Sequence, residues 1–108
     1  MPYKIEITEH AIRDLEELYD YIYLKDVPGK VEYVIDKIES IVNELVDYPN
    51  RGVYPLELRE IGIKEFREVF FKPYRIIYRI IKDTIYIMLI TDGRRDMQAL
   101  LQRRLLND

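Results

Sequence analysis

Alternate positions differ in character along YRIIYRII, residues 74–81, and this pattern predicts a β-strand. A period of two residues sends alternate side chains to opposite faces of a strand. One face of this segment is tyrosine and isoleucine, and the other carries two arginines between isoleucines. Similar segments lie on either side, at Phe66–Phe71 and Thr84–Thr91, so we expect three successive antiparallel strands. Such a sheet has an apolar core face and a second face set with arginines.

Earlier in the chain, apolar residues recur every three or four positions, which predicts two helices. The first begins at Glu9 and ends before Pro28-Gly29, and the second runs from Lys30 to about Val46. In the first helix we expect a buried stripe and a solvated face, made respectively of Ala11, Leu15, Leu18 and Ile22, and of Arg13, Asp14, Glu17 and Asp20. The two helices are expected to form an antiparallel hairpin across the sheet.

Three further elements complete the predicted fold. Tyr3–Thr8 and Leu56–Ile61 are expected to be strands, and Asp96 to about Leu106 a helix. The order is therefore β-α-α-β-β-β-β-α, an α+β fold in a single domain over residues 1–108.

The short turns predict the strand register. A two-residue turn at Lys82-Asp83 would pair core residues across the last two strands as Ile80 with Ile85, Tyr78 with Ile87 and Ile76 with Leu89. The opposite face would then show Arg75, Arg79, Tyr86 and Met88.

The face that Arg67 occupies depends on the connection at Lys72-Pro73. With two loop residues Phe70 opposes Arg75, and Arg67 lies on the face opposite to Arg75. With an odd number of loop residues, or a bulge, Arg67 and Arg75 share a face. We favour the odd loop, because it keeps Arg67 out of the core.

Charge is distributed unevenly along the chain. Residues 1–50 carry 5 Lys/Arg against 12 Asp/Glu, whereas residues 51–108 carry 12 against 8, within a net charge of −3. This suggests an acidic helical half and a basic sheet half, although charges that merely solvate the surface would give the same counts. With no secretory signal and no apolar run of membrane-spanning length, we expect a soluble, cytoplasmic protein with no membrane partner.

Most familiar catalytic and metal-binding patterns are missing. With no cysteine and a single histidine, the chain can form neither a thiolate nucleophile nor a nitrogen- or sulfur-ligated metal site. His10 is expected on the surface, and Ser40, the one serine, lies inside the second predicted helix. The four glycines are isolated, so no phosphate-binding loop is present. We expect no metal and no cofactor.

What remains is arginine and tyrosine on the predicted sheet. The guanidinium group stays cationic and offers a planar fork of donors that matches phosphate oxygens. Several such groups could hold a phosphodiester and stabilise the charge of its transition state. Alternatively, Arg75 and Arg79 form ordinary salt bridges with carboxylates such as Glu68 and Asp92.

These segments resemble the RelE/ParE superfamily of toxins from type II toxin–antitoxin systems, over essentially the full chain. The similarity is carried by ITEHAIRDLEELYDYI, YPNRG, FREVFFKPYRIIYRIIKDTIYIMLI and DGRRDMQALLQRRLL. The resemblance implies a small curved antiparallel sheet packed by a helical hairpin. It also implies growth arrest by the free toxin, and an antitoxin that wraps around it in a hetero-oligomer.

One branch of this superfamily, the RelE-like toxins, cleaves mRNA on the ribosome with basic residues and no metal. The resemblance makes Arg67, Arg75 and Arg95 the catalytic candidates, which would bind phosphate and stabilise transition-state charge. It leaves assisting roles in binding to Arg79, Arg94, Tyr78 and Tyr86. This chain departs from that branch at Val69, where a lysine is usual, and at Leu101, where a tyrosine is usual. It also lacks the C-terminal histidine of YoeB-like members.

The other branch, the ParE-like toxins, inhibits DNA gyrase without hydrolysing RNA. The tail RRDMQALLQRRLL loosely resembles that branch through Arg95, Asp96, Leu100, Arg103 and Leu105. Together with the missing tyrosine and histidine, this favours a non-enzymatic gyrase inhibitor. A ribosome-dependent mRNA endoribonuclease is the alternative, and an inactive relative that only binds its antitoxin is the third possibility.

Overall fold

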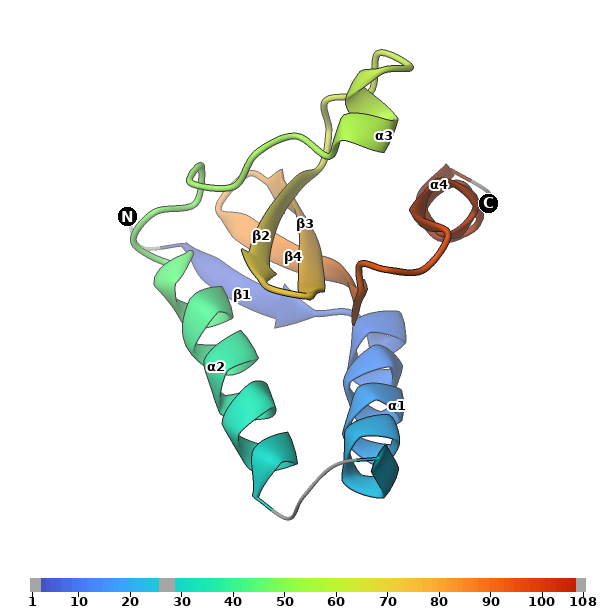
Figure 1. Ribbon diagram of the computed structural model, residues 1–108. Coiled ribbons are helices and arrows are strands. Elements are labelled where there is room, and N and C mark those ends of the chain that lie inside the picture. Colours follow the sequence, from blue (N-terminus) through green and yellow to red (C-terminus); the bar gives the residue numbers. More distant parts are fainter. Residues whose placement is uncertain (1–2, 26–28, 107–108) are drawn as a thin grey trace.

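The computed structural model describes residues 3–25 and 29–106, and it has the predicted α+β architecture (Figure 1). Its elements are β1 (Lys4–Ile7), α1 (Glu9–Lys25), α2 (Lys30–Glu44), α3 (Leu56–Arg59), β2 (Arg67–Phe71), β3 (Tyr74–Ile81), β4 (Thr84–Asp92) and α4 (Met97–Leu101), which continues into the π-helical turn η1 (Gln102–Leu106). Pro28, expected just after the first helix, lies outside the described residues.

The four strands are arranged in the order β1-β4-β3-β2. Neighbours among β2, β3 and β4 are antiparallel, as predicted for strands joined by tight turns. In contrast, β1 runs parallel to β4, with Ile5 opposite Ile85. A strand that enters the sheet through a helical connection, rather than a hairpin, is free to take this direction.

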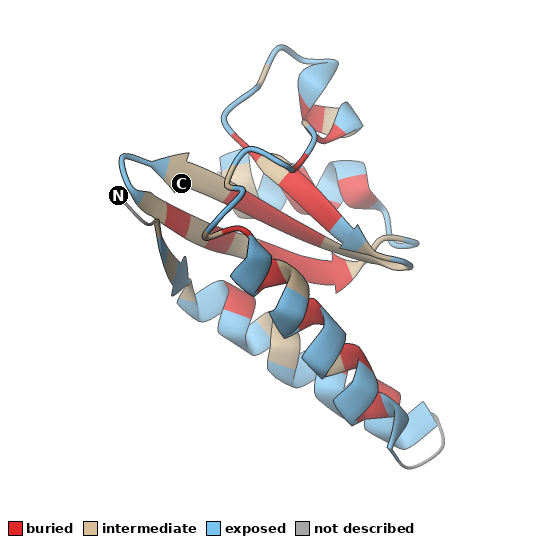
Figure 2. Ribbon diagram, turned by 90° about the vertical axis from the view of Figure 1, so that its left-hand side faces the viewer, coloured by how far each residue is buried: buried red, intermediate tan, exposed pale blue. Residues whose placement is uncertain are grey.

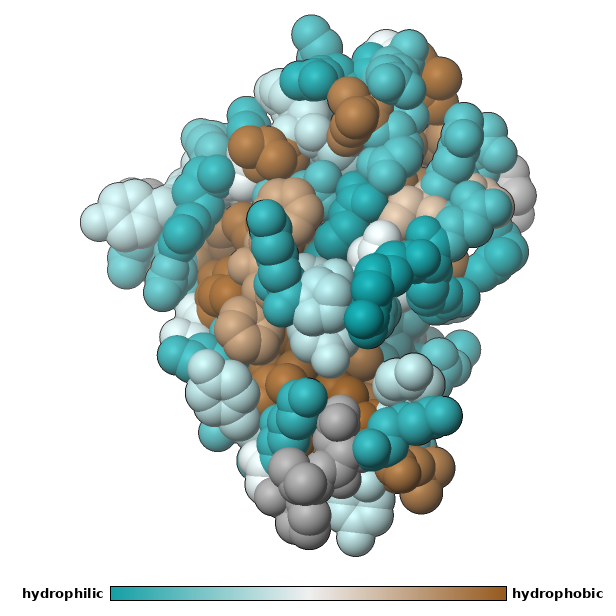
Figure 3. Space-filling view, in the orientation of Figure 1, coloured by the Kyte–Doolittle hydropathy of each residue, from teal (hydrophilic) through white to brown (hydrophobic). Residues whose placement is uncertain are grey.

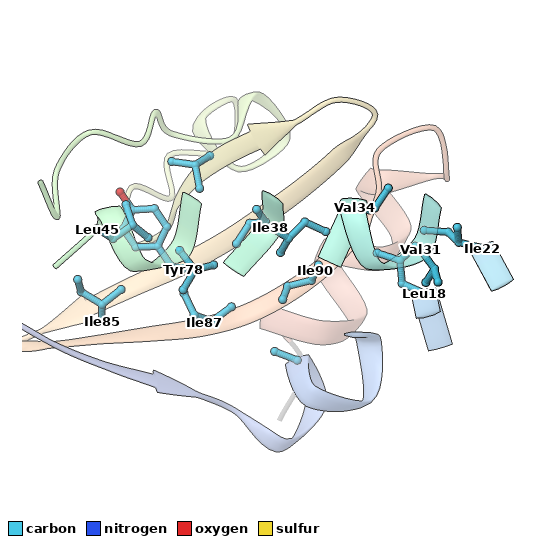
Figure 4. Close-up of a cluster of buried hydrophobic side chains, with 14 residues drawn as sticks. Leu18, Ile22, Val31, Val34, Ile38, Leu45, Tyr78, Ile85, Ile87 and Ile90 are labelled. Carbon is cyan, nitrogen blue, oxygen red and sulfur yellow. The ribbon is translucent and has the colours of Figure 1, made fainter. Parts of the chain in front are cut away.

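The hairpin of α1 and α2 covers one face of the sheet, which we call the hairpin face (Figure 1). The main core lies between them and consists of Ala11, Leu18, Ile22, Val31, Val34, Ile38, Val42, Leu45, Val69, Ile76, Tyr78, Ile85, Ile87 and Ile90 (Figure 4). Both helices turn buried stripes inward and exposed residues outward (Figure 2). The predicted stripe of α1 is confirmed, with Leu15 half-buried at the margin of the core.

The opposite face of the sheet, here the second face, carries a smaller core of its own. Ile77 and Leu89 are fully buried there, and they pack with Leu58, Phe66, Met97, Leu100 and Leu101. The expectation of a surface set with arginines was therefore wrong over much of this face. The isoleucines and leucines between the arginines are apolar enough to hold α4 and α3 against the sheet.

A β-bulge explains how Leu89 reaches the second face. Ile80 opposes Ile85 and Tyr78 opposes Ile87 as predicted, but the register shifts between Ile77 and Tyr78. Met88 is the extra residue, so Ile76 faces Ile90 instead of the predicted Leu89. One additional residue reverses the orientation of the side chains beyond it.

The segment Leu56–Ile61 is not the predicted strand. It contains the short helix α3, in which the Arg59 amide donates to the Pro55 carbonyl at 2.8 Å, and Gly62 follows with φ 81°. Within Leu56–Ile61 only Leu58 is buried, and it packs in the smaller core on the second face, which we call the second core. Instead of a further strand, an isolated antiparallel β-bridge between Val53 and Glu68 lies next to β2.

The Lys72-Pro73 connection has two residues, so Phe70 opposes Arg75 and Arg67 opposes Tyr78. The odd loop that we favoured was wrong. Arg67 lies on the hairpin face and Arg75 on the second face, because residues paired across an antiparallel ladder share a face. Arg67 avoids the core in another way, since it sits at the start of β2, where the sheet meets the loop of residues 49–54.

Candidate functional site

The predicted arginines do not form one site. Arg95 lies on the same side as Arg75: its guanidinium donates to Thr91 Oγ1 at 3.3 Å, and Thr91 is the cross-strand partner of Arg75. Arg67 is on the other face of the sheet. The three guanidinium groups therefore do not share one face of the sheet, as the predicted phosphate site requires.

Two carboxylates hold Arg75. Its Nε donates to Glu68 Oε1 at 2.7 Å, and Nη1 and Nη2 donate to the two oxygens of Glu57 at 2.9 and 2.8 Å. A fourth bond joins Nη2 to Glu68 Oε2 at 3.1 Å. The Arg75 side chain is only 13% exposed. With one cation between two carboxylates, we name this group the Arg75 clasp; its formal charge is negative, which disfavours a phosphate ligand.

The pKa shifts within the Arg75 clasp follow from this geometry. The hydrogen bonds from Arg75 lower the pKa of Glu57, and those bonds also raise the already high pKa of Arg75. Burial raises the pKa of Glu68, and the bonds from Arg75 oppose this rise only in part. The arginine therefore stays charged, and in this structure it is paired with both carboxylates.

Gly93 lets the chain pass close to Arg75. A Cβ atom at this position would lie 2.7 Å from Arg75 Cδ and 3.0 Å from the Pro73 carbonyl oxygen. The Gly93 amide donates to that same carbonyl at 2.8 Å. The Asp92-Gly93 turn thus packs against the aliphatic stem of Arg75 and helps to fix the position of that side chain.

Arg67 has quite different surroundings. Its guanidinium stacks on the Tyr54 ring, 4.6 Å from the centroid. Nη1 donates to the carbonyls of Gly52 at 2.8 Å and Asn50 at 3.3 Å, and Nη2 donates to the Tyr54 hydroxyl at 3.2 Å. No carboxylate in the described part of the chain pairs with Arg67.

Tyr78 fixes the loop that supports Arg67. Its hydroxyl donates to the Pro49 carbonyl at 2.7 Å and accepts from the Gly52 amide at 2.9 Å. The side chain is fully buried, and burial raises the pKa of its phenol. Its predicted role as a binding residue is not visible in this geometry, where the hydroxyl is already used to hold the loop.

The remaining candidates are more exposed. Arg79 lies 3.5 Å from Glu65 and above the Phe66 ring, and its cross-strand partner Tyr86 is half-buried. Arg94 forms an ion pair with Asp92 at 2.6 Å and lowers the pKa of that carboxyl. The salt-bridge alternative thus describes Arg75 and Glu68 correctly, whereas the partner of Arg79 is Glu65 and the partner of Asp92 is Arg94.

Two hollows lie next to these arginines. The larger, about 550 Å³, lies between α1 and the end of β4 and has charges of both signs, from Asp14, Glu17, Asp92, Arg94 and Arg95. The smaller, about 300 Å³, we call the Arg67 pocket; it is lined by Asn50, Tyr54, Lys64, Glu65, Arg67, Tyr78, Arg79 and Ile80. In the space-filling view, apolar side chains show at the centre between hydrophilic ones (Figure 3).

An ion pair that the sequence did not reveal joins α1 to the C-terminal segment. Asp14, expected in water, is half-buried against Arg104, with two bonds of 2.9 Å. Asp14 also accepts the Ile90 amide at 3.0 Å, and Arg104 donates to the Met88 carbonyl at 3.1 Å. The pair binds the edge of β4 beyond the end of β1, which no pattern along the chain could indicate.

The described residues contain no group of three or more histidine, cysteine, aspartate or glutamate side chains that could hold a metal ion. None of the helices in residues 3–25 and 29–106 has both the length and the apolar character needed to cross a bilayer.

Comparison with known proteins identifies a matching protein family. Residues 5–97 match the model of the family described as the ParE toxin of the type II toxin–antitoxin system, parDE. No curated protein matches the chain.

Solved structures share the fold. The chromosomal ParDE toxin–antitoxin system from P. aeruginosa contains a chain with 21% identity and a TM-score of 0.69, over 83% of this chain and 95% of that one. The toxin–antitoxin complex RelBE2 from Mycobacterium tuberculosis has 22% identity and a TM-score of 0.57, over 85% and 99%. A mutant of the E. coli toxin RelE in the free state has 14% identity and a TM-score of 0.63, over 97% and 100%.

Proposed function

The chain belongs to the ParE toxin family of type II toxin–antitoxin systems, and from this premise we propose that it inhibits DNA gyrase. The family match covers most of the chain, and inhibition of gyrase is the typical activity of this family. In this proposal the toxin has no catalytic step of its own and needs neither metal nor cofactor.

The observation that carries the choice between gyrase and mRNA is the Arg75 clasp. Four hydrogen bonds to Glu57 and Glu68 occupy the guanidinium that would have to bind a scissile phosphate. Releasing it would leave two carboxylates beside the substrate, one of them buried, and both would repel a phosphodiester. A nuclease built on this arginine would therefore be inhibited by its own neighbours.

The two departures from the nuclease branch support the same choice. Val69 and Leu101, which stand where that branch has a lysine and a tyrosine, are buried in the main core and the second core respectively. Both side chains are packed in a core, so neither position offers a polar group to a substrate. Arg67, on the opposite face from Arg75, cannot supply the missing charge.

For the partner, we infer a cognate antitoxin that forms a hetero-oligomer with this chain. The structural relatives include a ParDE system and a RelBE2 toxin–antitoxin complex. Gyrase acts in the cytoplasm, so the proposal places the action of the toxin there.

The decisive experiment runs two assays on the same preparation, purified with its antitoxin and then freed from it. We expect the free toxin to inhibit DNA supercoiling by gyrase, and the antitoxin to restore supercoiling. Primer extension on mRNA from induced cells should show no new ends. Cleavage at codon boundaries with normal supercoiling would favour the endoribonuclease, and harmless expression with neither effect would favour an inactive relative.

A further inference from the structure

The inhibition of gyrase proposed above assigns no role to the Arg67 pocket. We propose that this pocket is a receptor for one acidic side chain of the antitoxin, whose carboxylate binds Arg67 in a hollow that Lys64 and Arg79 also line, at the edge where the two faces of the sheet meet. The inference rests on the proposed function only for the existence of an antitoxin, not for the target of the toxin.

Local charge in the Arg67 pocket favours an anion. Three cations and one carboxylate line the pocket, in a protein whose net charge is −3. The one carboxylate, Glu65, is 63% exposed and lies 3.5 Å from Arg79, so it does not neutralise Arg67 or Lys64. An anionic group is the ligand that this arrangement stabilises.

The guanidinium group of Arg67 is held in place before any ligand binds. Stacking on Tyr54 and bonds to two backbone carbonyls fix its guanidinium, so little side-chain entropy is lost on binding. Those bonds use Nη1 and part of Nη2, whereas Nε donates to no group in residues 3–25 and 29–106. The edge that carries Nε can still bind a carboxylate oxygen. Arg75, with its four bonds to carboxylates, is the contrasting case.

The charge around the pocket favours a protein ligand over a nucleic acid. The helical hairpin is strongly acidic and would repel a polyanion, but a single carboxylate meets only the local positive charge. Ile80 and the Tyr54 ring give the pocket apolar walls, which suit the aliphatic stem of a glutamate.

The test follows the Nε–Hε resonance of Arg67 by NMR in the free toxin. The probes are N-acetylglutamate methylamide, inorganic phosphate and a short single-stranded DNA. We expect the glutamate probe to shift this resonance saturably and the DNA to bind more weakly at this site. A shift caused only by the DNA, or no shift with any probe, would overturn the proposal.

Variants separate the pocket from the fold. Lys64→Gln changes an exposed side chain and should weaken binding of the glutamate probe several-fold, whereas Lys37→Gln, on α2 outside the pocket, should leave it unchanged. Arg67→Lys, followed through the Tyr54 amide, should weaken binding further, because a lysine lacks the planar fork. Equal binding by the wild type and Lys64→Gln would contradict the proposal.

The identity of the occupant is tested in the toxin–antitoxin complex. There the pocket should already be filled, so the Arg67 resonance should be shifted and should no longer respond to the glutamate probe. A response as large as in the free toxin would show that the antitoxin does not occupy the pocket. Neither readout involves gyrase, so failure to inhibit gyrase would leave this result standing.

Discussion

Two arginines from neighbouring strands show how strongly local surroundings decide what a residue can do. Arg75 is paired with two carboxylates and packs against Gly93. In contrast, Arg67 stacks on an aromatic ring and donates hydrogen bonds to backbone carbonyls. Both were candidates for the same chemistry from sequence, because spacing shows which side chains share a strand but not which distant loop will reach them. Glu57, on α3, is such a distant partner.

At this scale the first prediction concerns the Arg75 clasp. Arg75→Met should lower the free energy of unfolding by about 3–5 kcal/mol, because it leaves the buried Glu68 without its cation. The measurement is urea denaturation. Adding Glu68→Gln to Arg75→Met should recover part of the loss, and a double variant no more stable than the single one would show that the charge of Glu68 is not the cause.

A second prediction concerns acid stability. The pKa values of Glu57 and Asp92 are lowered, so the folded chain binds fewer protons than the unfolded chain in this range. Their stabilising contribution is present above the unfolded values, about 4.3 and 3.9, and is lost as the pH falls through the lower folded values. Glu68 acts in the opposite sense, because its pKa is raised.

Glu57→Gln should therefore flatten the decline in stability below about pH 4.3, measured by thermal unfolding across that range. Glu60→Gln, on the exposed residue that follows α3, is the matched control and should keep the decline. An unchanged decline in Glu57→Gln would mean that the Arg75–Glu57 bonds do not contribute to acid stability.

At the scale of elements, periodicity predicted the helices and the three hairpin-connected strands, since their apolar residues recur at regular intervals. It failed where one residue decides the outcome. Met88 forms a bulge and Leu58 is the buried residue of α3, and neither feature alters a repeating pattern. The two-residue connection before Tyr74 is a similar case, because polarity was compatible with either register.

The loop of residues 49–54 gives the third prediction. A Cβ atom on Gly52 would lie 2.5 Å from the Tyr78 hydroxyl oxygen and 2.8 Å from the Glu68 carbonyl oxygen. Gly52→Ala should destabilise the fold by about 1–3 kcal/mol through overpacking and should disturb the support of Arg67. Val53→Ala, at an exposed neighbour, should have little effect on the melting temperature. Equal melting temperatures for wild type and Gly52→Ala would contradict the tight contact.

The fourth prediction concerns the C-terminal segment. Asp14→Ala removes the acceptor of the Ile90 amide and the partner of Arg104. Hydrogen exchange should accelerate at Ile90 and through η1, because that end of the chain loses its bond to α1. Glu17→Ala, also on α1 but exposed, serves as the control. Protection at Ile90 equal to that in the wild type would show that the strand edge does not depend on Asp14.

At the scale of the whole molecule, the fold and the family followed from sequence because the order of elements and the core segments extend along most of the chain. The site did not, because the shared surface predicted for Arg67, Arg75 and Arg95 depended on one register. With two loop residues before Tyr74, the arginines belong to opposite sides of the sheet. The three arginines predicted to bind one phosphate therefore lie in two separate environments.

The parallel pairing of β1 with β4 has a consequence for synthesis. The strand β1 pairs with β4, which is synthesised much later. Next to β1, the Thr8 hydroxyl donates to the carbonyl of Ile87, 79 positions further along the chain. During translation β1 therefore remains unpaired until β4 has left the ribosome. A nascent chain interrupted before that point cannot complete the sheet, so a message cut short should yield a harmless product.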